Sequence, residues 1–223
     1  MSQVHQIWFQ GEPPDYLRRR MRKNFPEATL WNERQILDLI KEHYPNYLEW
    51  FQNLRTLIVK CDVARAFILH FHGGIYADCD FDPNSNFANF GIQDAVVFAG
   101  DPWFGCNNYL ISSPPKAPFW LKYLDAIAQT LEEPLLKDMF TSILLTTWPI
   151  LSLSGPVQIR RLINQYPDLA RVSGKEGAWG SHGGRDERGA WFSMSQYRLQ
   201  KYTVLFLFFF AVIGILKVYS YIA

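Results

Sequence analysis

The chain has 223 residues, of which 48% are hydrophobic and 19% charged, and its formal net charge at pH 7 is +1. This composition excludes a disordered chain, and the balanced charge gives no indication of nucleic acid as a partner. Three cysteines without a CxxC pair argue against a disulfide framework and against a zinc site, and they favour a reducing compartment.

Hydrophobic periodicity and turn residues predict strands and helices that alternate along most of the chain. In chain order we expect a strand at 4–9, a helix at 15–25, a strand at 28–32, helices at 33–44 and 47–54, a helix from 55 that the Gly73–Gly74 pair ends, strands at 75–81, 95–100 and 107–113, and helices at 117–133 and 155–166. The Gly-rich, charged stretch at 173–189 is predicted to be a loop. This alternation predicts an α/β fold with a mostly parallel, Rossmann-like sheet flanked by helices.

The last residues of the chain are strongly apolar. The uninterrupted apolar part, residues 203–216, covers about 21 Å as a helix, whereas the hydrocarbon core of a bilayer is roughly 30 Å thick. Lys217 could reach the headgroups on the far side, and Arg198 and Lys201 favour a cytoplasmic position for what precedes them. We therefore expect a membrane-associating C-terminal helix at 197–223, although a helix buried in the domain and one lying in the membrane interface both stay open.

Three aspartates at alternate positions mark the segment HGGIYADCDFDP, residues 72–83. Asp78, Asp80 and Asp82 match the first ligand positions of an EF-hand loop, but Pro83 and Asn89 stand where that loop needs Gly and Glu. A calcium loop of that type is therefore excluded. A plain acidic turn and a site for another cation both remain as interpretations.

The surroundings of these aspartates favour a bound cation. Residues two apart on a strand share a face, so Asp78 and Asp80 are predicted to leave one sheet edge together. Ligands bind at such carboxyl edges, and hard carboxylate oxygens suit Mg²⁺ or Mn²⁺. Asp62 and Arg65 lie at i and i+3 of the preceding helix, where they could hold sugar hydroxyls or form a plain ion pair.

A family resemblance rests on several segments together. The stretch KCDVARAFILHFHGGIYADCD resembles the signature of the DXD-containing sugar transferases of glycosyltransferase family 32. Further matches are HQIWFQG at 5–11, Leu30-Trp31, Ser154 to Pro156, His182 and the Ala190-Trp191 pair. The resemblance covers nearly the whole chain up to about residue 195, so that residues 1–196 are expected to form one GT-A glycosyltransferase domain.

The resemblance implies a metal-dependent enzyme that moves a hexose from a UDP- or GDP-sugar to a glycan or lipid-linked acceptor, with retention of configuration. It implies Mn²⁺ or Mg²⁺ as the cofactor, held by Asp80 and Asp78, with His182 as a further candidate ligand. His182 could equally be a loop histidine without a role. Asp62, Arg65 and Asp80 are the catalytic residues that it implies.

The resemblance also implies a set of contacts to the nucleotide-sugar donor. Asp62 and Arg65 should contact the hexose and its phosphate, and Asp78 the metal shell or the ribose. Trp8 should pack near the nucleotide base, although a core tryptophan is the competing interpretation. Gly74 completes the residues assigned to the donor.

One departure from the family pattern leaves rival functions open. Ala190 stands where the family has Ser before Trp191, so a contact to the metal or phosphate from that side is in doubt. A non-catalytic, membrane-tethered relative and a nucleotide-sugar hydrolase are the alternatives to a transferase. The expected location is a membrane, with the catalytic domain facing the cytoplasm.

Overall fold

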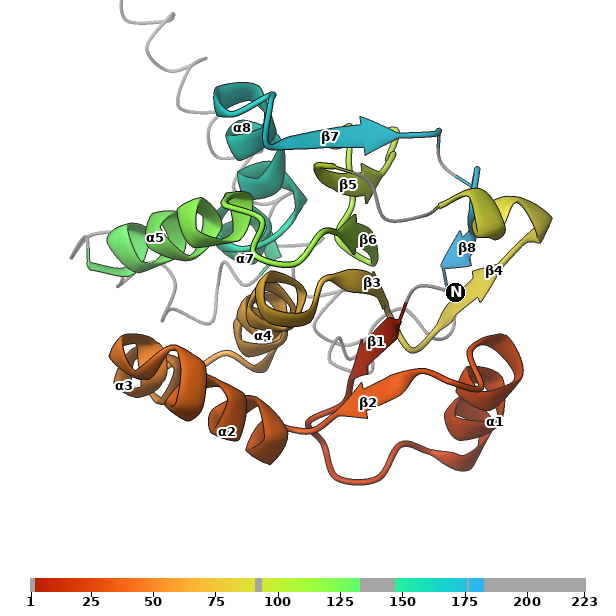
Figure 1. The fold of residues 1–223 in the computed structure, drawn as a ribbon, viewed down its shortest axis with the longest axis horizontal. Coiled ribbons are helices and arrows are strands. Elements are labelled where there is room, and N and C mark those ends of the chain that lie inside the picture. The colour runs from red at the N-terminus through yellow and green to blue at the C-terminus, as the bar shows by residue number, and fades with distance from the viewer. Residues whose placement is uncertain (1–2, 91–93, 133–146, 176, 183–223) are drawn as a thin grey trace, which may run out of the picture.

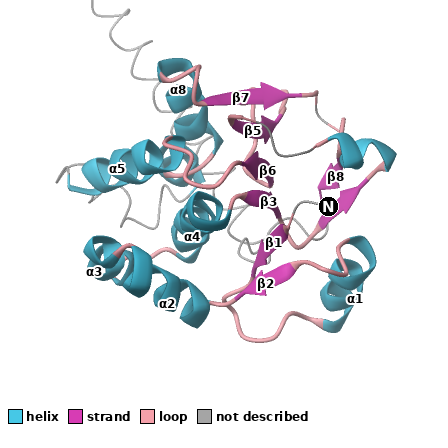
Figure 2. Ribbon diagram, in the orientation of Figure 1, coloured by secondary structure: helices cyan, strands magenta, loops and turns pink. Residues whose placement is uncertain are grey.

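The computed structural model of the chain describes residues 3–90, 94–132, 147–175 and 177–182, and the part so described is an α/β domain (Figures 1 and 2). Its strands are β1 (Val4–Ile7), β2 (Thr29–Trp31), β3 (Gly74–Ala77), β4 (Phe81–Pro83), β5 (Val96–Ala99), β6 (Leu110–Ser113), β7 (Ala170–Ser173) and β8 (Gly180–His182). Its α-helices are α1 (Asp15–Asn24), α2 (Glu33–His43), α3 (Leu48–Gln52), α4 (Leu57–His72), α5 (Phe119–Glu132), α7 (Thr147–Leu153) and α8 (Pro156–Gln165), with short 3-10 turns at Pro45–Tyr47 and Ser85–Asn89. These elements confirm the alternation that the sequence predicts.

The central sheet has six strands in the order β2-β1-β3-β6-β5-β7. β1 pairs in parallel with β2 and β3, and β5 with β7, whereas β6 is antiparallel to both of its neighbours. Among the described strands of this sheet, β6 alone is therefore reversed, and the sheet is mostly parallel as expected. Figure 1 shows α2, α3, α4, α5, α7 and α8 on one side of the sheet, with α1 and the β4–β8 ribbon on the other.

Local sequence explains where several helices begin and end. Asn32 caps α2 through a hydrogen bond from the Gln35 amide, and the Gln35 side chain accepts from the Asn32 amide in return, both at 2.9 Å. Pro156 occupies the first turn of α8, where its missing amide hydrogen costs nothing. Gly73 ends α4 with a φ of +66°, a conformation that favours glycine.

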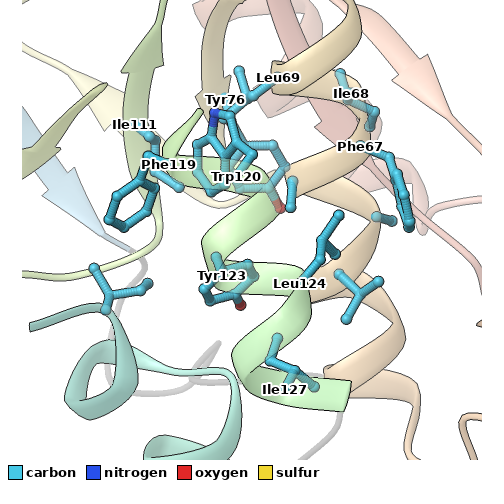
Figure 3. Packing of buried hydrophobic residues seen from close by; sticks show 14 of the residues in the cluster. Phe67, Ile68, Leu69, Tyr76, Ile111, Phe119, Trp120, Tyr123, Leu124 and Ile127 are labelled. Atoms are coloured by element: carbon cyan, nitrogen blue, oxygen red, sulfur yellow. The ribbon is translucent and has the colours of Figure 1, made fainter. Parts of the chain in front are cut away.

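The core lies between the sheet and the helices of one side, with α4 at its centre. Figure 3 shows α5 packed against α4, through Trp120, Tyr123, Leu124 and Ile127 on α5 and Phe67, Ile68 and Leu69 on α4. All of these side chains are buried. Burial of a Leu, Ile or Phe side chain contributes about 1.5–3 kcal/mol relative to an exposed position, so these contacts hold α4 and α5 together.

The predicted strand at 75–81 is wrong in one respect. The strand β3 ends at Ala77, and the chain turns through Asp78 to Asp80 before β4 begins. The amide of Phe81 donates to the carbonyl of Asp78 at 3.0 Å, which closes this turn, and β4 then pairs with β8 rather than with the main sheet. The predicted loop at 173–189 likewise contains a strand, β8.

The apolar C-terminal segment at 197–223 lies outside the described residues, as do Ala190 and Trp191. In the part of the chain that the structure describes, no helix has the length and apolar character needed to cross a membrane. The expected C-terminal helix therefore stays a prediction.

Candidate active site

One edge of the sheet collects the segments that the sequence singled out. Because five strands run in the same direction, their carboxyl ends meet there, and the residues that follow β1, β2, β3 and β5 are Trp8, Asn32, Asp78 and Gly100. The reversed strand β6 brings its amino end to the same edge, where the carbonyl of Tyr109 accepts from the amide of Asp78 at 2.9 Å. In open α/β sheets this edge is where ligands bind.

Asp78 is held at this edge by a tyrosine and an arginine. The hydroxyl of Tyr76 donates to Asp78 Oδ1 at 2.7 Å, and Arg65 Nη1 lies 3.9 Å from the same oxygen. The guanidinium of Arg65 also lies 4.4 Å from the centre of the Tyr76 ring. Asp80 is half-buried in the turn that follows. The two aspartates therefore come to the edge in a turn, not on one face of a strand.

Asp62 and Arg65 form an ion pair deep beneath Asp78. Arg65 Nη2 lies 3.0 Å from Asp62 Oδ1, and the two residues are only 6% and 2% exposed. The hydroxyl of Ser154 donates to Asp62 Oδ2 at 2.6 Å, and Asn108 Nδ2 donates to Oδ1 at 2.9 Å. Burial raises the pKa of Asp62 to about 6, although Arg65 and the hydrogen bond from Ser154 both lower it. The intrahelical ion pair, one of the two interpretations of this spacing, thus exists and is part of a larger buried network.

The third aspartate of the motif has a different role. Arg20 donates from Nε to Asp82 Oδ1 at 2.9 Å and from Nη2 to Oδ2 at 2.7 Å, and Asn24 adds a bond to Oδ1 at 2.5 Å. These bonds, from Arg20 above all, lower the pKa of Asp82. Asp82 therefore anchors α1 to β4, while Asp78 and Asp80 remain the candidates for a ligand. Nothing in the sequence pattern of α1 distinguishes Arg20 from the other arginines of its basic run.

Trp8 lines an open cavity of ≈390 Å³ beside this edge. The other residues that line it are Phe9, Gly11, Glu12, Asn32, Glu33 and Arg34. Trp8 packs against the small apolar cluster of Leu17, Met21 and Cys79, which lies under α1. Its indole Nε1 is buried and has no hydrogen-bond partner among the described residues. A ligand that offers an acceptor would satisfy this group.

Two predicted site residues lie elsewhere or are only partly described. Gly74 is at the opposite end of β3 from Asp78, with a φ of +94°, and a Cβ there would lie 2.5 Å from the carbonyl oxygen of Gln3. Its role in the structure is the close approach of β1 to β3, and the structure does not bring it to the site. The backbone of His182 pairs with Phe81, the residue after Asp80. The side chain of His182 lies outside what the structure describes.

The residues present suit a hard divalent cation held partly by its substrate. In the described ranges no three His, Cys, Asp or Glu side chains come together, so no complete protein cage for a metal is formed there. Mg²⁺ typically uses one or two carboxylates and takes its other ligands from water and phosphates. The pair Asp78 and Asp80, half-buried at the carboxyl edge, matches that requirement.

Comparison with known proteins agrees with this geometry. Residues 16–97, which include α4 and the DXD segment, match the family model described as "Glycosyltransferase sugar-binding region containing DXD motif". The resemblance to the DXD-containing sugar transferases is confirmed. The matched part of the chain contains Asp62, Arg65, Asp78 and Asp80.

Several curated proteins resemble the chain over this region. Mannosyl phosphorylinositol ceramide synthase SUR1 of Saccharomyces cerevisiae is 28% identical over 135 residues, which cover 56% of this chain and 34% of that protein. Inositol phosphoceramide mannosyltransferase 1 of Schizosaccharomyces pombe is 28% identical over 124 residues (52% and 39%). The uncharacterized glycosyltransferase L373 of Acanthamoeba polyphaga mimivirus is 34% identical over 95 residues (39% and 38%). The matches thus span little more than a third of these relatives.

A solved structure shares the fold. The PaToxG glycosyltransferase superposes with a TM-score of 0.51 at 14% identity, and the match covers 74% of this chain and 68% of that one. At this identity the similarity concerns the fold alone, and it supports the GT-A-like architecture expected from the resemblance.

Sequence reasoning missed two residues of the buried network. Tyr76 lies two positions before Asp78, a spacing that places both on one face of an extended strand, so the alternation could have suggested it. Asn108 has no local signal, because its contact to Asp62 spans 46 positions. Ser154 was noted only as part of a motif, and its bond to Asp62 spans 92 positions.

Proposed function

We propose that the chain is a metal-dependent glycosyltransferase that moves a hexose from a UDP- or GDP-sugar to a glycan or lipid-linked acceptor, with retention of configuration. The observation that supports this most is the junction of Asp78 with the buried pair Asp62–Arg65 at the carboxyl edge of the sheet. The family match supports sugar transfer, while retention rests on the resemblance alone.

Each side chain of the site has a proposed task. Asp80 and Asp78 would hold Mn²⁺ or Mg²⁺, with His182 as a further candidate ligand. When bound, the ion would supply positive charge beside the diphosphate leaving group. Arg65 would add a cationic contact near the same phosphate, since its guanidinium lies beside Asp78. The carboxylate of Asp62 accepts three protein donors, so Oδ2 keeps capacity for one hydroxyl of the hexose.

The nucleotide base would occupy the cavity beside Trp8. The indole presents a flat apolar surface there, and its buried Nε1 has no partner in the described structure. The relatives named as inositol phosphoceramide mannosyltransferases favour mannose as the first sugar to test and an inositol-containing lipid as the first acceptor. A lipid acceptor would agree with a transferase domain at 1–196 and a membrane-associating helix at 197–223.

The experiment is donor breakdown by the full chain across a panel of UDP- and GDP-sugars, with Mn²⁺ and with a chelator. Metal-dependent release of one nucleotide supports the proposal and names the donor. Release that an added acceptor does not change, with free sugar as the product, favours a nucleotide-sugar hydrolase. Absence of both release and metal-dependent donor binding contradicts the proposal and favours a non-catalytic relative.

A further inference from the structure

The turn that joins α7 to α8 contacts the candidate donor site through one buried hydroxyl. Ser154 lies in this turn, fully buried, and its hydroxyl donates to Asp62 Oδ2 at 2.6 Å. The serine is itself fixed at both backbone groups. Its amide donates to the carbonyl of Ile150 at 3.0 Å, and the hydroxyl of Tyr123 donates to its carbonyl at 2.6 Å. The hydroxyl of Ser154 is thus held in one place.

The other oxygen of Asp62 is bonded within the same buried network. Asp62 Oδ1 accepts from Asn108 and pairs with Arg65, and Arg65 Nη1 in turn donates to the carbonyl of Asn108. The same nitrogen lies 3.9 Å from Asp78. An unbroken series of contacts therefore runs from Ser154 through Asp62 and Arg65 to the first aspartate of the DXD segment.

We propose that Ser154 is a positioning residue of the donor site, whose hydroxyl fixes the orientation and the charged state of Asp62 and so keeps Arg65 directed at Asp78. This inference rests on the proposed function for its effect on turnover. Removal of the hydroxyl leaves one oxygen of a buried carboxylate without its donor, which is costly. The carboxylate then rotates or takes up a proton, and in either case Arg65 loses part of the partner that holds it.

The charged and titratable groups facing Asp62 set the direction of a pH effect. Arg65 on the same helix lowers the pKa of Asp62, whereas Asp78 at the sheet edge raises it, and the neutral Tyr123 faces it from α5. The bond from Ser154 lowers the pKa. Loss of that bond is therefore expected to raise the pKa of Asp62 further, so that a larger fraction of Asp62 is protonated near pH 6 than in the native chain.

Three variants of the full chain test this inference. Ser154→Ala removes the hydroxyl, Ser154→Thr keeps it, and Ser113→Ala is the matched control. Ser113 is also fully buried and accepts a bond from Trp120 Nε1 at 2.9 Å, but it lies at the other end of β6 from the site. Loss of the Ser113 hydroxyl is expected to lower the stability of the domain without changing the pKa or the orientation of Asp62.

The first measurement needs no turnover. The carboxyl carbon of Asp62 is followed by NMR in protein with ¹³C-labelled aspartate, while the pH is varied. We expect a higher midpoint in Ser154→Ala, and an unchanged midpoint in Ser154→Thr and Ser113→Ala. An unchanged midpoint in a folded Ser154→Ala protein overturns the inference, whether or not the chain is a transferase.

The second measurement is the pH profile of donor breakdown with Mn²⁺. We expect the acid limb of the pH profile to lie at higher pH in Ser154→Ala than in the native chain. The kcat of this variant should be lower than the native value by about tenfold at pH 6 and by less at pH 8. Ser154→Thr should restore the native profile. A uniform loss at every pH, with the same loss in Ser113→Ala, overturns the positioning role. Absence of turnover in the native chain contradicts the proposed function and leaves the NMR result to decide the inference.

Discussion

The guanidinium of Arg20 forms a two-point ion pair with the carboxylate of Asp82, which lies 62 positions further along the chain. This pair removes one of the three clustered aspartates from the candidate metal site. It also explains why the cluster is tolerated, because the charge of Asp82 is compensated by α1. Asp78 is in turn hydrogen-bonded by Tyr76 and faces Arg65. Asp82 therefore has a structural role, which leaves Asp78 and Asp80 as the candidates for ligand binding.

Arg20→Gln is expected to lower the free energy of unfolding by about 1 kcal/mol at pH 7, a small value because the Asp82 side chain is 45% exposed. The pKa of Asp82 is lower in the folded protein than in the unfolded chain. The ion pair therefore contributes its full stability above the pKa of Asp82 in the unfolded chain. That stability is lost as the pH falls through the pKa of Asp82 in the folded protein. The difference from the native chain should therefore shrink below about pH 4. Urea unfolding at several pH values measures it, with exposed Arg19→Gln as the control.

Asp80→Asn is expected to abolish metal-dependent donor turnover and leave the fold intact, because Asp80 lies in a turn at the sheet edge and not in the core. Turnover with Mn²⁺ and a thermal unfolding curve provide the two measurements. Asp38→Asn makes the same chemical change at an exposed position of α2 and should change neither. Native-like turnover of the Asp80 variant would refute the metal assignment.

Trp8→Ala is expected to weaken donor binding by about tenfold, since stacking of a base on an aromatic ring is worth roughly 1–3 kcal/mol. Trp8→Phe keeps an aromatic face and should recover most of the affinity. Titration calorimetry with the nucleotide diphosphate identified by the donor panel measures the difference. Equal affinity in all three proteins would place the base elsewhere and leave Trp8 as a packing residue of the α1 cluster.

Gly74→Ala is expected to destabilise the domain by about 3 kcal/mol, because its Cβ would lie 2.5 Å from the carbonyl oxygen of Gln3 in addition to the strain of a φ of +94°. Gly11→Ala is the matched control. Gly11 has a φ of +78° but nothing lies within 4 Å of a Cβ there, so only the backbone strain of about 1 kcal/mol remains. Similar losses in chemical unfolding would contradict a packing role for Gly74.

Deletion of residues 197–223 is expected to release the protein from membranes, because this segment is the most apolar stretch of the chain. Flotation with vesicles measures the bound fraction of the full chain and of the shortened one. Continued flotation of the shortened chain would mean that another surface binds the membrane.

Local patterns of the sequence predict most of the helices and strands, because each depends on neighbours within a few positions. The spacing of Asp62 and Arg65 predicts their pairing in the same way, as one helical turn brings them together. The DXD segment and its position after a strand could also be predicted from local sequence. These features require only the periodicity of helices and strands and the chemistry of turns.

Contacts between distant segments were decided by the tertiary structure. Nothing local shows that β6 runs against its neighbours, that the chain turns at Asp78, or that Arg20 among several arginines meets Asp82. The bond from Ser154 to Asp62 joins segments 92 positions apart, and it forms only because α7, which precedes Ser154, packs against α4. The sequence by itself provided the candidates for binding a sugar nucleotide and a metal. Which of them meet depends on how the buried apolar faces pack, since that packing fixes the positions of side chains far apart in the chain.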